Sequence, residues 1–203
     1  MERLKKWAIL SSMSAIATPE KTQTAGSPGG LNQLEQLKKF TRVVADTGPL
    51  NYLLLIGHID VVPQLFSRVC IPAAVREELS DPVAPAPVRA WIAAPPGWLS
   101  IMPAPAHVDP ALAALDDGEQ AAIALASATN ADLLLMDDRD GVAVARARGV
   151  EVTGTLGVLD RAALRGLIDL STAFAALRAT NFHVNQKLLD VLLAAHQVRG
   201  GIR

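Results

Sequence analysis

The chain is 203 residues long, has 50% hydrophobic residues and carries a formal net charge of −1. This is enough apolar material for a full core and favours one main domain. The balanced charge gives no overall attraction to nucleic acid, and with only 4% aromatic residues a platform of rings that stacks single-stranded bases is disfavoured. The single cysteine, Cys70, cannot form an internal disulfide, and no apolar run is long enough to span a membrane. We therefore expect a cytoplasmic protein with no membrane partner.

Residues 1–40 are predicted to form an N-terminal extension, followed by one folded domain over residues 41–203. Basic residues ahead of the apolar stretch 7–10 faintly resemble a signal peptide, but serines interrupt that stretch, so export is not expected. Residues 18–32 are polar and rich in Gly, Pro, Ser and Thr, which predicts a flexible linker. A short amphipathic helix that docks on the domain or on a partner is then predicted from four apolar residues at helical spacing: Leu31, Leu34, Leu37 and Phe40.

The first strand of the domain is predicted over residues 42–45 and ends at Asp46. Its β-branched residues suit a strand covered on both faces, and Gly48 and Pro49 then open an apolar helix over 50–56. Proline is commonest at the first helical position, so Gly48 is expected to cap this helix and Asp46 to lie outside it. Ligands of open α/β sheets bind beyond the carboxyl ends of the strands, which makes Asp46 a candidate site residue.

A second acid follows the next predicted strand, over 68–71. A helix begins at Pro72, and Glu77 and Glu78 fall near its N-terminal half. Acids in an early helical turn are usually solvated and slightly favoured by the helix dipole, which accounts for Glu77. Glu78 is retained as a candidate site residue.

A third acid lies in the predicted helix over 115–126. Glu119 is one turn before Ala122, on the apolar face of this helix, so its carboxylate is expected to point inward. Either Asp116 or Asp117 can cap the helix, which leaves Glu119 available for another role.

The fourth acidic site follows a continuous apolar run over residues 133–136. Such a run predicts a central parallel strand, and it delivers Asp137 and Asp138 to the carboxyl end. One of these two acids is expected to cap a helix over 141–148.

The other segments continue the alternation of strands and helices, which predicts an α/β fold with a central parallel sheet and helices on both faces, that is, three α/β/α layers. The remaining predicted elements are a helix near 88–93, strands over 98–102 and 151–153, and helices over 155–165, 173–179 and 187–196.

In such a sheet Asp46, Glu78, Glu119 and Asp138 are expected to meet at one edge. Ionised carboxylates that lie close together repel one another, so the cluster needs shared protons or bound cations. Oxygen ligands favour a hard ion, Mg²⁺ or Mn²⁺, and the four histidines are too scattered along the chain to indicate zinc.

Missing residues exclude several other α/β enzymes that use acids. No lysine occurs between Phe40 and Gln186. This excludes P-loop proteins, which need a phosphate-binding lysine, and also receiver domains and haloacid-dehalogenase-type phosphatases, which require a lysine as well. Neither a G-x-S-x-G elbow nor a G-x-G-x-x-G loop is present. Asp138 and Asp140 match the D-x-D of topoisomerase-primase domains, but the first strand of those domains should end in Glu rather than Asp46.

Four motifs in this order resemble the PIN domain, and most closely the PIN-like proteins of prokaryotic toxin–antitoxin loci that are related to VapC toxins. They are VVADTGPL with Asp46, IPAAVREEL with Glu78, LDDGEQAAIALA with Glu119, and LLLMDDR with Asp138. The later GTLGVL at 154–159 is similar to a helix of the same branch, so the likeness runs from Arg42 to the C-terminus.

The resemblance implies a Mg²⁺-dependent ribonuclease, with RNA as substrate, an antitoxin protein as partner and a homodimeric state. The catalytic acids would be Asp46, Glu78, Glu119 and Asp138. The chain departs from the family pattern at Glu119, where many PIN domains carry Asp, and at Met136, where Thr or Ser is common. The longer Glu119 is expected to shift the metal geometry, and Met136 removes a hydroxyl that usually hydrogen-bonds one acid.

The leading hypothesis is therefore a metal-dependent endoribonuclease in which Asp46, Glu119 and Asp138 hold the metal. Glu78 would be an outer ligand or orient a water, and Asp137 would be an auxiliary ligand. The alternative is a non-catalytic PIN-like module that binds RNA or protein. Five arginines are candidate contacts for flanking phosphates: Arg139, Arg146, Arg148, Arg161 and Arg165.

Overall fold

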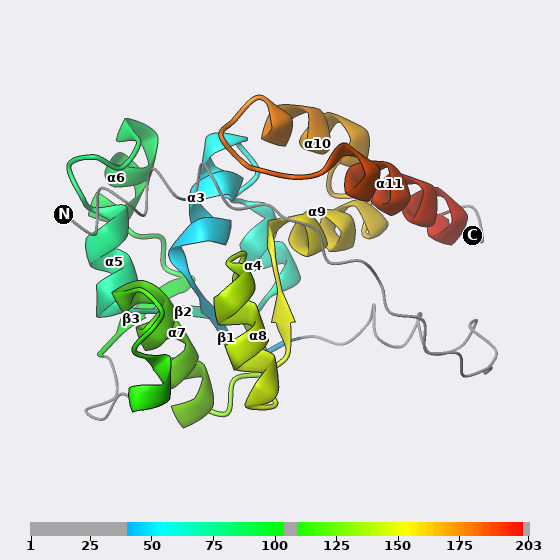
Figure 1. Cartoon of the computed structure of the whole chain (residues 1–203). Coiled ribbons are helices and arrows are strands. Elements are labelled where there is room, and N and C mark those ends of the chain that lie inside the picture. The colour runs from blue at the N-terminus through cyan, green and yellow to red at the C-terminus, as the bar shows by residue number, and fades with distance from the viewer. Residues whose placement is uncertain (1–39, 104–108, 201–203) are drawn as a thin grey trace.

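The computed structural model describes residues 40–103 and 109–200 (Figure 1). The predicted linker and all of the predicted amphipathic helix except Phe40 lie outside these residues. Within them, no helix is long and apolar enough to cross a membrane.

A five-stranded sheet forms the centre of the domain. Its strands stand in the order β3-β2-β1-β4-β5 and every neighbouring pair is parallel, which confirms the predicted architecture. The middle strand, β1, pairs with β4 in the register Val43 to Leu133 and Ala45 to Leu135. The bounds are β1 Val43–Ala45, β2 Val69–Pro72, β3 Leu99–Met102, β4 Leu133–Leu135 and β5 Val152–Thr153.

Helices connect these strands, and those predicted within the described residues are present with shifted ends. Helix α10 begins earlier than expected because Asp169 caps it, accepting the Thr172 N–H at 2.7 Å. The bounds are α3 Thr47–Leu55, α4 Val61–Leu65, α5 Ala73–Leu79, α6 Ala86–Ala93, the 3₁₀ turn η1 Pro110–Leu112, α7 Asp117–Ala128, α8 Arg139–Ala147, α9 Thr155–Leu164, α10 Leu170–Arg178 and α11 Gln186–Gly200.

The two faces of the sheet build two separate cores, because successive side chains of a strand point to opposite sides. Val43 and Ala45 of β1 belong to the larger core, to which α3, α4, α5, α6, α9, α10 and α11 also contribute. Val44 belongs to the smaller core, which is covered by α7 and α8. The result is the predicted three-layer α/β/α arrangement.

The start of β1 is fastened to the domain by Phe40 and Asp132. Phe40 is 1% exposed and packs edge-on against Phe66, with the guanidinium of Arg161 4.6 Å from the centre of its ring. The Asp132 carboxylate accepts the backbone N–H groups of Thr41 and Arg42. Phe40, the last of the four apolar residues of the predicted amphipathic helix, therefore lies in the core of the domain.

Candidate active site

Asp46 directly follows β1 and is 3% exposed. Its backbone N–H donates to the Leu135 carbonyl at 2.9 Å, so it continues the pairing of β1 with β4. The prediction that Gly48 caps the next helix was wrong: α3 begins at Thr47, and Asp46 is its N-cap, accepting the Gly48 N–H at 3.4 Å. Pro49 is tolerated because N–H groups of a first turn have no partner within the helix. Such a long cap bond is weak, and capping alone gives little reason to bury this carboxylate.

Glu78 is buried as well, but it is placed differently from the prediction. It is the next-to-last residue of α5 rather than a residue of the N-terminal half, because the helix is only seven residues long. Its Oε1 accepts the Gly118 N–H at 3.1 Å, and its Oε2 accepts the hydroxyl of Thr47. Glu78 thus joins the first turn of α3 to the first turn of α7. Gly118 is required for this approach, since a Cβ there would stand 2.5 Å from Glu78 Oε1.

Glu119 faces inward as predicted and is 8% exposed. Asp116 caps α7 by accepting the Glu119 N–H at 2.9 Å, which confirms one of the two expected caps. Glu119 is itself part of the cap, which the sequence did not predict. Its Oε2 accepts the Asp116 N–H at 3.4 Å, so the two acids form a reciprocal capping box.

Asp137 and Asp138 leave β4 in different directions. Asp138 caps α8, and its Oδ1 accepts the N–H groups of Asp140 at 2.8 Å and Gly141 at 2.9 Å, as predicted for one of the pair. Asp137 instead reaches the start of α9. There its Oδ1 accepts the Thr155 N–H at 2.7 Å, and its Oδ2 accepts the Thr155 hydroxyl at 2.6 Å.

The electrostatics connect three of the acids. The pKa of Asp137 is raised to about 6, mainly by burial. The two Thr155 hydrogen bonds lower it, and the charges of Asp46 and Asp138 contribute to the rise. Asp46 and Asp138 are therefore both close enough to repel Asp137. The sequence analysis named Asp137 only as an auxiliary ligand. It missed Thr155, although this residue belongs to the GTLGVL stretch that follows β5.

The arginines are distributed less favourably for binding phosphate than expected. Arg139 is exposed and next to Asp138, at the edge that carries the acids. Arg146 lies in the last turn of α8, at the far end of the helix. Arg161 covers Phe40 at the start of β1, and Arg165 donates to the Gln64 carbonyl at 3.1 Å.

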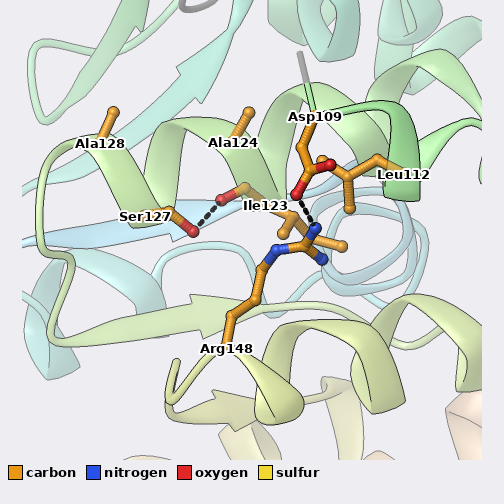
Figure 2. Close-up of a pocket in the computed structure, with 7 residues that line it drawn as sticks. All are labelled: Asp109, Leu112, Ile123, Ala124, Ser127, Ala128 and Arg148. Carbon is orange, nitrogen blue, oxygen red and sulfur yellow. Dashed lines mark hydrogen bonds and ion pairs between the residues drawn. The ribbon is translucent and has the colours of Figure 1, made fainter. Parts of the chain in front are cut away.

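Arg148 is at the far end of α8 as well, about 15 Å from the Asp138 cap by helix geometry. Figure 2 shows its guanidinium reaching Asp109, whose Oδ2 is 2.5 Å away. This pair lines a shallow pocket together with Leu112, Ile123, Ala124, Ser127 and Ala128. Of the five predicted phosphate contacts, only Arg139 is therefore positioned beside the acids.

Asp46, Glu78, Glu119, Asp137 and Asp138 all lie at the carboxyl edge of the sheet, and each is oriented by an N–H at the start of a helix. Within the described residues, no three Asp, Glu, His or Cys side chains have the close arrangement of a preformed metal site. The donor chemistry nevertheless fits a hard divalent cation, because the group consists of carboxylates. The charges of Asp46 and Asp138 also raise the pKa of Asp137, which a nearby cation would counteract.

A family model described as a PIN domain matches residues 42–197. The chain belongs to the PIN-domain family. PIN domains are generally nucleases, so the fold is of a nuclease type. No curated protein and no solved structure shows significant similarity to the chain. The family assignment agrees with the order of the motifs around Asp46, Glu78, Glu119 and Asp138.

Proposed function

We propose that this PIN-domain protein is a metal-dependent endoribonuclease that hydrolyses RNA phosphodiesters with Mg²⁺ or Mn²⁺. The observation that carries the proposal is the buried Asp137 carboxylate, whose pKa is raised by burial and by the charges of Asp46 and Asp138, at the carboxyl edge of the sheet, where α/β proteins bind ligands. Folding pushes these charges together at a cost in free energy. A bound cation would offset that cost.

The charge at this edge also limits which substrates can approach. An RNA phosphate that approaches this edge would lie near several carboxylates. Of the five arginines considered above, only Arg139 lies there. Bringing two negative groups together without a counter-ion is unfavourable, so a divalent cation between them is the simplest way to accept an RNA backbone. A neutral or cationic substrate would not require one.

The roles of the acids follow from their surroundings. Asp46, Glu119 and Asp138 would hold the cation, with Asp137 as an auxiliary ligand. When bound, Mg²⁺ or Mn²⁺ supplies a water of lowered pKa as the nucleophile and neutralises charge on the phosphate. Glu78, held between the Thr47 hydroxyl and the Gly118 N–H, is suited to orient that water because its carboxylate cannot swing away.

Cleavage of a mixed RNA pool tests this function directly. Wild type should cut RNA with Mg²⁺ or Mn²⁺ and not with EDTA, and Asp46→Asn, which keeps the shape and removes the charge, should lose about 100-fold or more, beyond the 10–100-fold typical of outer-shell residues. Asp60→Asn is the matched control, since Asp60 is exposed and its side chain makes no cap hydrogen bond. Equal cleavage by the Asp46 and Asp60 variants would refute the site.

The same experiment decides the alternative of a non-catalytic module. RNA that is bound by wild type but left intact under every metal condition would favour a binding function. We further propose, on the family resemblance, that the protein is the toxin of a toxin–antitoxin pair, acts in the cytoplasm and is a homodimer. Growth arrest on expression that Asp46→Asn relieves would support the toxin role, and a mass of one 21.4 kDa chain by light scattering would refute the dimer.

A further inference from the structure

Thr155 makes a two-point contact with the acid edge from a residue outside the four motifs. It is the first residue of α9 and is 0% exposed. Its backbone N–H and its hydroxyl donate to different oxygens of Asp137, at 2.7 and 2.6 Å. Hydrogen bonds to a charged acceptor are stronger than neutral ones, and two of them fix both the position and the rotation of the carboxylate.

Two glycines provide the space in which the Asp137 carboxylate lies. A Cβ at Gly154 would overlap Asp137 Oδ1, and a Cβ at Gly48 would stand 3.4 Å from Asp137 Oδ2. The carboxylate therefore lies in a slot between the first turn of α3 and the start of α9. Gly48 is two residues after Asp46, so this slot borders directly on the acid that follows β1.

We propose that Thr155 is a positioning residue, which holds the Asp137 carboxylate toward Asp46 and Asp138 so that the three acids form one cation-binding set. This inference rests on the proposed metal-dependent function. It also accounts for Met136, which has no hydroxyl to offer the neighbouring acids. Here Thr155, 18 residues after Asp137, supplies the hydroxyl.

A purely structural role for Thr155 makes a different prediction. If its hydroxyl only docks α9 onto the sheet, removing the hydroxyl lowers stability and leaves cation affinity unchanged. If it positions Asp137, cation affinity falls as well, by the 10–100-fold typical of residues that orient metal ligands. Measuring both quantities on the same variants separates the two roles.

The test uses Thr155→Val, which keeps the shape and the backbone N–H, and Thr155→Ser, which retains the hydroxyl. Thr155→Ala serves if the valine variant does not fold. Thr129→Val is the matched control, because the Thr129 hydroxyl donates to the Leu125 carbonyl at 2.8 Å, at the C-terminal end of α7. Mn²⁺ affinity is read from the rise in melting temperature with added Mn²⁺ and no RNA, and kcat and KM are then measured at saturating Mn²⁺.

We expect Thr155→Val to weaken Mn²⁺ binding about 10–100-fold, and Thr155→Ser and Thr129→Val to remain close to wild type. Wild-type Mn²⁺ affinity in both Thr155→Val and Thr155→Ala, with only a lower melting temperature, would overturn the positioning role. A wild type that binds Mn²⁺ but cuts no RNA would refute the proposed ribonuclease, and the affinity of the Thr155 variants would still decide the positioning role. A wild type that shows no Mn²⁺ response would refute both.

Discussion

In the metal-free protein, Asp137→Asn should become increasingly more stable than wild type as the pH rises, because wild type loses stability and the variant does not. Folding raises the pKa of Asp137 from 3.8 to about 6, so the folded protein favours the protonated carboxyl. The stability that this group contributes is present in full below pH 3.8 and is lost as the pH rises through about 6. Asparagine stays neutral at every pH, and its carbonyl can still accept the Thr155 N–H.

The size of the effect follows from the shift. A difference of about two pKa units corresponds to roughly 3 kcal/mol of unfolding free energy, lost by wild type between about pH 4 and pH 7.5 and not by the variant. For a chain of this size, that amounts to about 6–12 °C in melting temperature. Melting curves in EDTA across this range measure it, with the exposed Asp140→Asn as the control. A difference between Asp137→Asn and wild type that stays constant with pH would refute the reasoning.

Two further substitutions test the neighbouring structure. Gly118→Ala should gain about 1 kcal/mol of helix propensity, yet lower RNA cleavage, because its Cβ would stand 2.5 Å from Glu78 Oε1 and displace that carboxylate. Gly97→Ala is the control, because a Cβ at Gly97 would have open space around it. Equal cleavage by both variants would contradict the role of Glu78. Phe40→Ala should cost about 3–5 kcal/mol in urea unfolding, as for a buried core phenylalanine, and a loss below about 1 kcal/mol would place Phe40 outside the core.

The sheet and its order along the chain were predictable because each strand is a short apolar run followed by a turn or a helix. The run before Asp137 shows this best, since three leucines of β4 fill both cores and leave the acids at the edge. Helix ends were predicted less well. Apolar spacing says nothing about whether Asp46 or Gly48 caps α3, because that choice depends on one side-chain hydrogen bond.

The chemistry of the site was only partly visible in the sequence. The residue types and the shared edge followed from the positions of the acids after strands and near helix starts. The contact between Asp137 and Thr155 did not, because two residues 18 apart come together only when α9 is docked. Glu78 was assigned to the wrong end of α5 for a related reason: a pattern shows where a helix can form, but not that this one stops after seven residues.

The central place of β1 in the sheet has a consequence for the growing chain. Among the strands of the described residues β1 is synthesised first, yet its partner β4 comes about 90 residues later, and the pairing is parallel. At about 5–20 residues per second on the ribosome, one edge of β1 has no partner strand for about 5–18 s. During that time, the unpaired N–H and C=O groups of an apolar strand are open to other chains. Nascent chains that end before Leu133 should therefore be the species that recruits chaperones or aggregates, whereas chains that extend past Leu135 should not.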